Sequence, residues 1–297
     1  MAEKIRPLTI FLAVDGSEHA RVATEIVCSL PLPKGSTVIA LAVLDTPHTP
    51  RRQLLLAALT QTQEYLNKYG LTPEIGLLHG HPAEALTSYA DEHHPDLIVL
   101  GAKGLRATLG ILLGGVAQQV IEYAKCPVLI TRPPFKPIKR VLAVTDGSIF
   151  SQQALKYLTQ FPLLPETDVH LVYVVPPMPE YQIGSFSHTI LSGSDALHPV
   201  PIELLEEVEN WQEEAEETGK NLLAEGKEIL SKAKIKVTSK LLHGDAATEI
   251  LNYNKELGID LIVAGSRGLS PMKGWLLGSV SHKLVHYATC SVLIVRA

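Results

Sequence analysis

The sequence predicts an α/β protein of two tandem domains, each a five-stranded parallel sheet with helices on both faces. Two observations predict this fold class. Short runs of Val, Ile and Leu alternate with longer segments of helical periodicity. Such continuously apolar runs are typical of strands that are buried on both faces. The whole pattern also occurs twice in 297 residues, a length that suits two domains of about 150 residues.

A repeated phrase marks the two copies. Asp-Gly-Ser follows the first apolar run at residues 15–17 and follows a near-identical run at residues 146–148, an offset of 131. Later matches, beginning with His-Gly at 79–80 and at 243–244, are offset by 164. The two offsets differ by 33, so the second copy carries 33 extra residues between its second and third strands.

The elements of the first copy follow in order from its apolar runs. We expect strands at residues 8–14, 37–43, 74–78, 96–100 and 128–131. Parallel strands need connections of a dozen or more residues, so crossover helices are expected between them. Ser17 and Ser148 stand where the first helix of each copy should begin. Both are plausible N-caps, because a serine hydroxyl can accept a hydrogen bond from the first helical turn.

A proline-rich linker separates the domains. Three prolines within residues 132–137 disfavour a helix and favour a stiff extended spacer. The first domain is therefore expected at residues 1–132 and the second at residues 138–297, with the insertion around residues 176–210.

The insertion has two parts. Residues 176–201 are rich in Pro, Gly and Ser and predict a loop, whereas residues 202–233 have the periodicity of a long amphipathic helix. The glutamates of this helix form either a solvated face or an acidic docking face.

Composition restricts the classes of function. Lys plus Arg number 26 and Asp plus Glu number 31, so the net charge is −5, which disfavours a nucleic-acid partner. No apolar run reaches the 18 residues or so of a membrane span. The apolar N-terminal run recurs in mid-chain, which favours a strand over a secretion signal. Three cysteines without a CxxC motif suggest a reducing, cytoplasmic location.

One motif of the second copy carries recognisable chemistry. Gly265-x-x-Gly268 follows the fourth strand, and after nine residues Gly278-Ser279-x-Ser281 opens the last helix. Open parallel sheets bind ligands at the carboxyl ends of their strands. Glycines there allow close approach of an anion, and a helix start adds free N–H groups. With two serine hydroxyls as further donors, the pattern suits a triphosphate tail.

This motif, together with a strand that ends in Asp-Gly-Ser, resembles the universal stress protein family, and the duplication resembles its tandem form. The resemblance covers nearly the whole chain except about 176–201. It implies a Rossmann-like, adenine nucleotide alpha hydrolase-like fold that binds ATP or another adenine nucleotide, with or without Mg²⁺. It implies adenine and ribose contacts at Val144, Thr145, Asp146 and Val174. It implies phosphate contacts at Gly265, Arg267, Gly268, Gly278, Ser279, Val280 and Ser281.

The first copy departs from the pattern. Its loop retains the glycines, but Gly115 and Ala117 stand where the second copy has serines. A hydrogen bond to a charged group contributes roughly 1.5–3 kcal/mol, so losing two could cost about two to four decades of affinity. We therefore expect a weak or empty first site. Its weaker candidate positions are Asp15, Val43, Gly101, Lys103, Gly104 and Gly114.

Other interpretations of single residues stay open. Asp15 and Asp146 also suit plain Asp-Gly turns, and Arg267 also suits a surface cation. The histidines do not complete a tetrahedral metal set, and we expect no metal site; they are His79, His81, His93, His94, His282 and His286. Cys126 and Cys290 precede the final strands and are expected to be buried packing residues.

Three functions compete: an ATP-binding regulator, a slow ATPase or self-phosphorylating enzyme, and an interaction module with a vestigial site. We assign no catalytic residue, because the motif offers no clear general base and no Walker-type lysine. The final strands are expected to pair with each other, because an exposed edge needs covering. The chain would then be an internal pseudo-dimer, able to dimerise again.

Overall fold

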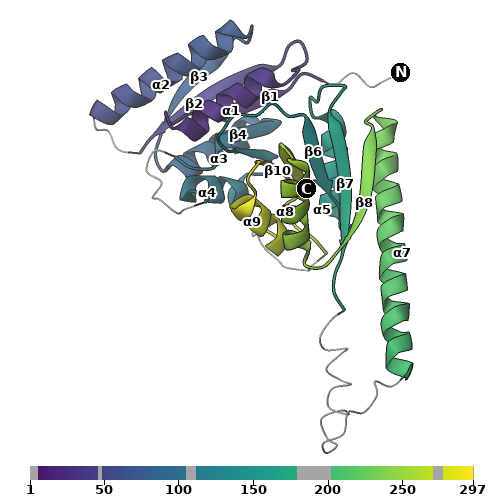
Figure 1. Ribbon diagram of the computed structural model, residues 1–297. Coiled ribbons are helices and arrows are strands. Elements are labelled where there is room, and N and C mark those ends of the chain that lie inside the picture. The colour runs from purple at the N-terminus through teal and green to yellow at the C-terminus, as the bar shows by residue number, and fades with distance from the viewer. Residues whose placement is uncertain (1–5, 46–48, 105–111, 179–201, 270–276, 297) are drawn as a thin grey trace, which may run out of the picture.

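The computed structural model describes residues 6–45, 49–104, 112–178, 202–269 and 277–296. Its centre is one ten-stranded sheet with the strand order β3-β2-β1-β4-β5-β10-β9-β6-β7-β8 (Figure 1). Each half of the chain contributes five neighbouring strands. All pairs of neighbours are parallel except β5 and β10, which meet antiparallel at the centre.

The elements of the first half confirm the predicted alternation of strands and helices. They are β1 (Thr9–Ala13), α1 (Glu18–Ser29), β2 (Thr37–Leu44), α2 (Thr49–Lys68), β3 (Glu74–His79), α3 (Pro82–His93), β4 (Leu97–Gly101), α4 (Gly115–Tyr123) and β5 (Val128–Thr131). Each predicted strand is present within one residue at either end. Ser17 is the N-cap of α1, and its hydroxyl accepts a hydrogen bond from the N–H of Ala20.

The second half repeats this order with one long helix in place of α2. Its elements are β6 (Arg140–Val144), α5 (Ile149–Gln160), β7 (Asp168–Val175), α7 (Ile202–Lys232), β8 (Val237–His243), α8 (Ala246–Leu257), β9 (Leu261–Gly265), α9 (Ser279–Tyr287) and β10 (Ser291–Val295). Ser148 is the N-cap of α5, as predicted. The helix predicted at 202–233 is confirmed as α7. The predicted loop at 176–201 lies outside the described residues from 179 onward.

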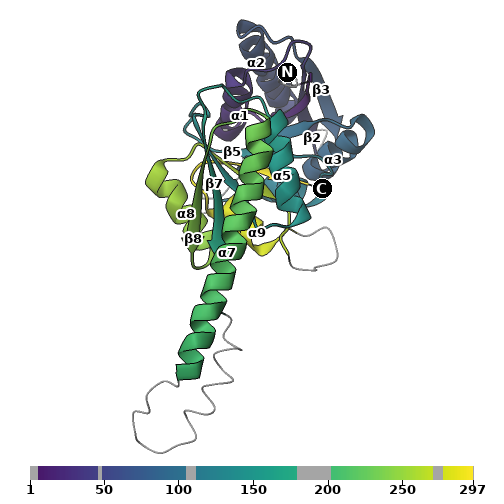
Figure 2. The same ribbon diagram turned by 90° about the vertical axis from the view of Figure 1, so that its right-hand side faces the viewer.

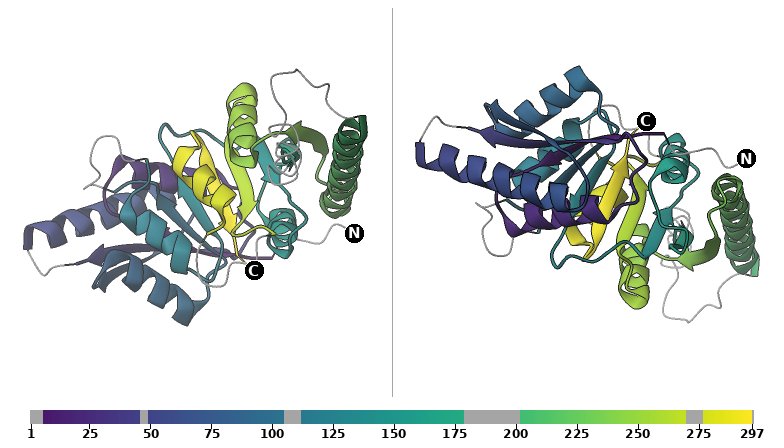
Figure 3. Two further views of the ribbon diagram at one scale, coloured as in Figure 1. Left: turned by 90° about the horizontal axis from the view of Figure 1, so that it is seen from below. Right: turned by 90° about the horizontal axis from the view of Figure 1, so that it is seen from above.

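Helices cover both faces of the sheet. One core cluster packs α1, α2, α5 and α7 against one face, and a second cluster packs α3, α4, α8 and α9 against the other. Figure 3 shows the helices flanking the sheet on both sides. Both clusters include residues of both halves, so each core runs across the central junction.

Helix α7 packs along β7 and β8 and continues beyond them. At 1.5 Å per residue its 31 residues span about 46 Å. Figures 1 and 2 agree that the N-terminal part of α7 projects away from the sheet. Gly219 and Gly226 of α7 are buried against the sheet. A Cβ at either position would come within 3 Å of a side chain from β7, so glycine allows the helix to pack this closely.

The two halves meet through their final strands. Leu129 pairs with Leu293 at the centre of the antiparallel β5–β10 ladder, and both side chains are fully buried. The pairing of the final strands that we expected from their exposed edges is therefore present within one chain.

Two arginines extend this junction reciprocally. Arg132 follows β5 and donates to the carbonyl oxygens of Cys290 (3.3 Å) and Val285, both in the second half. Its repeat counterpart Arg296 follows β10 and donates to the carbonyl of Ile121 (2.6 Å) in α4 of the first half. Each cation thus lies at the C-terminal end of a helix of the other half, where the helix dipole favours positive charge.

Candidate functional site

The site predicted in the second half is a cavity of about 270 Å³ at the carboxyl ends of β6 and β9. The structure brings every position predicted for this half to the lining of that cavity. These residues come from the end of β6, the end of β7, the loop after β9 and the first turn of α9. The cavity therefore occupies the sheet edge at which open α/β proteins bind ligands.

Asp146 is held in place by the backbone around it. Its Oδ1 accepts a hydrogen bond from the N–H of Ser148 (3.0 Å), so the Asp-Gly-Ser turn fixes the carboxylate. Its Oδ2 lies against Gly268, where an added Cβ would be only 2.6 Å away. Gly268 is therefore required for close approach of the loop to the carboxylate. The turn engages Oδ1, so a turn role of Asp146 does not exclude a site role through Oδ2.

A cluster of hydroxyls supports this turn. The Thr145 hydroxyl lies 3.3 Å from that of Ser151 and accepts from the N–H of Gly147 (3.3 Å). The Ser148 hydroxyl accepts from the N–H of Ser151 (3.2 Å). Ser151 also lines the cavity but was missed from the sequence, because it lies inside α5 and outside the motif. Comparison of the repeats could have found it, since the first half has Ala20 at the equivalent position.

The first turn of α9 faces the cavity with unsatisfied backbone donors. Gly278 is the N-cap and has no side-chain capping bond. The N–H groups of Ser279, Val280 and Ser281 therefore lack intrahelical acceptors, as at any helix start. The N–H of Gly278 donates to the carbonyl of Ser266 (2.9 Å), which fastens the helix to the loop after β9. Loop and helix together form a concave surface that suits an anion.

Ser281 differs from the prediction. Its hydroxyl donates to the carbonyl of Gly265 (2.7 Å), and its side chain is buried. A hydroxyl has one proton, so in this arrangement Ser281 fastens α9 to β9 and does not offer that proton to a phosphate. Ser279, in contrast, is exposed and lines the cavity. The two serines, which we expected to act alike, therefore differ in environment: the Ser281 hydroxyl is bonded within the fold and Ser279 is exposed.

Arg267 lies at the cavity and over an aromatic ring. Its guanidinium carbon is 5.4 Å from the centroid of the Phe150 ring, a cation–π distance. Phe150 belongs to the first turn of α5, against which Gly265 packs so closely that a Cβ would be 2.6 Å from the Phe150 carbonyl carbon. The ring therefore gives the arginine a defined position beside the cavity.

The first half has a corresponding cavity of about 630 Å³. All its weaker candidate positions line it: Asp15, Val43, Gly101, Lys103, Gly104 and Gly114. The backbone arrangement is the same as in the second half. Asp15 Oδ1 accepts from the N–H of Ser17 (2.9 Å), and a Cβ at Gly104 would lie 2.5 Å from Asp15 Oδ2.

The remaining candidates are not brought together into a metal centre. Among the described residues, no group of three or more His, Cys, Asp or Glu side chains could hold an ion. His93 stacks on Tyr89, and His282 lies against His286. Cys126 and Cys290 are partly buried and pack against the core, and burial raises the pKa of each thiol to about 12. Both thiols are therefore protonated and unreactive near neutral pH.

Fold and site geometry together define an open-sheet α/β protein with a cavity at its strand ends in each half. Within the described part of the chain, no helix is long and apolar enough to cross a bilayer. The family model described as the Universal stress protein family matches residues 8–132 and again residues 137–296. The chain belongs to the universal stress protein family.

Individual relatives agree with this assignment. The universal stress protein YxiE of Bacillus subtilis is 32% identical over 157 residues, which are 53% of this chain and 98% of that protein. The universal stress protein MJ0531 of Methanocaldococcus jannaschii is 28% identical over 158 residues, 53% of this chain and 82% of its own length. A solved universal stress protein from Archaeoglobus fulgidus aligns over 97% of this chain and 96% of its own, with 18% identity and a TM-score of 0.67. That last likeness concerns the fold.

Proposed function

We propose that the second half binds an adenine nucleotide, best ATP, and that occupancy of this site regulates the protein. The observation that carries the proposal is the single cavity lined by Asp146, the glycine loop after β9 and the open first turn of α9. The base and ribose would lie along Val144, Thr145, Asp146 and Val174. The phosphates would lie against the amides of the loop and helix, with Ser279 and Arg267 as side-chain donors.

We expect Mg²⁺ to bind as a complex with the nucleotide. Asp146 is the one carboxylate among the described residues that line the cavity. Mg²⁺ commonly binds through one or two carboxylates together with substrate phosphates and water. The ion would therefore arrive with ATP, and this chain would supply little more than charge balance through Asp146.

A regulatory role is favoured over rapid hydrolysis by the chemistry of the lining. Phosphoryl transfer requires a group that orients the nucleophile and cations that stabilise the transferred charge. Asp146 already accepts from the N–H of Ser148, and Arg267 lies over the Phe150 ring. We assign these two side chains to nucleotide binding and name no catalytic residue.

The quaternary proposal follows from the central junction. Because β5 and β10 cover each other within the chain, we infer that the chain acts as an internal pseudo-dimer. The outer strands β3 and β8 are the candidates for a further homodimer contact. We place the protein in the cytoplasm, where its three free cysteines would stay reduced.

Calorimetric titration of the full chain with MgATP tests the binding proposal. We expect one strong site, and we expect Arg267→Ala to weaken it about tenfold through loss of a charge-assisted hydrogen bond of ~1.5 kcal/mol. The matched control is Lys103→Ala, at the repeat-equivalent position of the first half, which should leave the strong site unchanged. Absence of saturable binding, or an equal loss in both variants, would contradict the proposal.

A further inference from the structure

The first-half cavity differs from the second-half cavity in the polarity of the side chains that line it. At four equivalent positions, a hydroxyl side chain of the second half is replaced by an apolar one or by glycine, whereas the capping serine is kept as Ser17. Val14 stands for Thr145, and Ala20 stands for Ser151. At the start of the helix, Gly115 and Ala117 stand for the two serines. The cavity keeps the backbone frame of the second-half cavity together with Asp15, Ser17 and Lys103, but it lacks the four hydroxyls that line its counterpart.

The walls of this cavity are apolar and well buried. Leu41, Val43, Leu86 and Leu100 line it, and each is less than 10% exposed. Helix α2 adds a wall through Leu55, which is 3% exposed. The second half has no such wall, because α7 contributes none of the described lining residues there. The cavity of about 630 Å³ is accordingly more than twice the volume of its counterpart.

The mouth of the cavity exposes large apolar side chains. Leu54 of α2 is 65% exposed and Val116 of α4 is 38% exposed, and both line the cavity. Exposed apolar side chains that line a cavity are typical of a site that a ligand covers. A ligand whose apolar body fills the cavity would remove both side chains from water.

Two cations and two carboxylates line this cavity. Lys103 and Arg51 line the cavity together with Asp15 and Asp45. Arg51 is ion-paired with Asp45 at 2.7 Å. Two carboxylates therefore balance two cations, as Asp146 balances Arg267 in the second half, so net charge does not distinguish the two cavities. One anionic group can still be met by the ammonium of Lys103, which occupies the position of Arg267 in the second half.

We propose that the first-half cavity binds a small amphiphile with an apolar body, such as an acyl chain, and one anionic head group beside Lys103. The two halves then bind different ligand classes in the same frame, and the proposal does not depend on nucleotide binding in the second half. Burial of one methylene contributes about 0.8 kcal/mol, which corresponds to about fourfold in affinity. Affinity should therefore rise about fourfold for each methylene until the cavity is full.

The test is a titration of the full-length protein, in excess MgATP, with hexanoate, octanoate and decanoate. We expect one saturable site per chain, with affinity rising along the series and with decanoate favoured over decanol. Gly115→Leu should weaken decanoate binding at least tenfold by filling the cavity. A Cβ at Gly115 meets nothing within 4 Å, so the fold should tolerate this change, and a denaturation curve verifies it. Lys103→Gln should remove the preference for decanoate over decanol.

The matched control is Arg267→Ala, which should leave decanoate affinity unchanged. Four results would overturn the proposal: no saturable binding of decanoate, binding that survives Gly115→Leu, binding that Arg267→Ala abolishes, or, in a separate titration started without nucleotide, displacement of bound decanoate by ATP with the same stoichiometry. A failure of ATP to bind the second half would not affect any of these outcomes. The two proposals can therefore fail independently.

Discussion

The two halves of this protein share a backbone frame and differ in the side chains that line it. Asp15 and Asp146 are held by the same turn, through an N–H bond from Ser17 in one half and from Ser148 in the other. In both halves a glycine gives room to the second carboxylate oxygen. The capping hydroxyl is common to both halves, as Ser17 and Ser148, whereas the hydroxyls of Thr145, Ser151, Ser279 and Ser281 have no counterpart in the first half. The shared backbone geometry is therefore a feature of the fold, and we expect the side chains that line each cavity to determine which ligand it binds.

This comparison changes the meaning of the glycine spacing in the motif. Gly101 and Gly265 each end a strand where a Cβ would meet the first turn of the neighbouring helix. Gly104 and Gly268 each face an aspartate oxygen. Both pairs satisfy packing needs that exist without any nucleotide. Glycine spacing alone therefore indicates the fold, and Ser279 with Arg267 is the better indicator of a phosphate site.

The largest expected effect tests whether the strand-end glycines are structural in both halves. A Cβ at Gly265 would lie 2.6–2.8 Å from backbone atoms of Phe150 and Ser151, and a Cβ at Gly101 would lie 2.5–2.9 Å from His19 and Ala20. Backbone cannot move aside cheaply, so Gly265→Ala and Gly101→Ala should each lower the free energy of unfolding by about 3 kcal/mol. Urea denaturation measures both. A large loss in one half only would contradict the shared frame.

The next largest effect is on MgATP affinity, which we expect to depend on the second half and not on the first. Gly268→Ala would push the Asp146 carboxylate, a movable side chain, so the fold should survive while the site is disturbed. Loss of two charge-assisted bonds of ~1.5 kcal/mol each should weaken MgATP binding on the order of 100-fold. The matched variant Gly104→Ala displaces Asp15 in the same way and should leave MgATP binding unchanged. Equal losses of affinity in both variants would show that the strong site is not confined to the second half.

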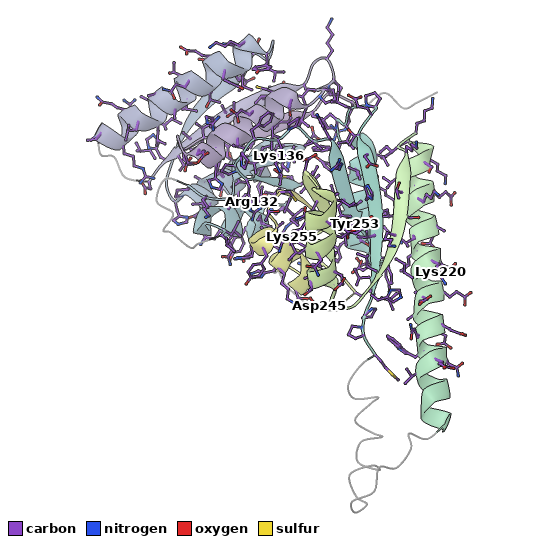
Figure 4. All side chains as sticks on the ribbon, viewed as in Figure 1. Arg132, Lys136, Lys220, Asp245, Tyr253 and Lys255 are labelled. Atoms are coloured by element: carbon purple, nitrogen blue, oxygen red, sulfur yellow. The ribbon has the colours of Figure 1, made fainter. Side chains whose placement is uncertain are left out.

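A smaller effect is expected at the junction, where the halves should behave alike. Arg132 and Arg296 each donate to carbonyls at a helix end of the opposite half. Replacement by alanine leaves those partly buried carbonyls unpaired, so each variant should lose about 2 kcal/mol of unfolding free energy. Lys136 in the neighbouring linker is exposed and is therefore a suitable control. Arg132 and Lys136 are both labelled in Figure 4. Lys136→Ala should change stability by less than about 0.5 kcal/mol.

Much of this architecture follows from the sequence because the underlying signals are local. The continuously apolar runs predict the strands, the serines at 17 and 148 predict the helix starts, and the repeated phrase predicts two domains. The antiparallel contact of β5 with β10 also follows, because two exposed edges in one chain can cover each other.

The details of the site were less predictable because they depend on packing between distant segments. No local pattern shows that Ser281 donates to the carbonyl of Gly265 and not to a ligand. The role of Ser151 depends on contact with Thr145 at the end of the preceding strand. Leu54 and Leu55 of α2 line the first-half cavity, and no motif encodes where that helix packs.

The smallest expected change in unfolding free energy is at the N-caps of α3 and α8, which are equivalent helices of the two halves. Asp245 caps α8 by accepting from the Thr248 hydroxyl (2.7 Å) and N–H (3.0 Å), and Figure 4 marks it at that helix start. These bonds hold the pKa of Asp245 below its ordinary 3.8. His81, at the start of α3, makes no side-chain capping bond. Asp245→Ala should therefore lower the unfolding free energy by about 1 kcal/mol at pH 7, and His81→Ala by almost nothing.

The sign of the pH dependence follows from the lowered pKa. The cap is charged in both folded and unfolded chains above pH 3.8, so its stabilisation is fully present there. As pH falls below 3.8 the unfolded chain takes up the proton first, and the stabilisation is lost through the lowered folded pKa. Denaturation curves of the natural chain and Asp245→Ala should therefore converge in acid. A constant difference down to pH 2 would mean that α8 is stabilised by the shape of the side chain and not by its charge.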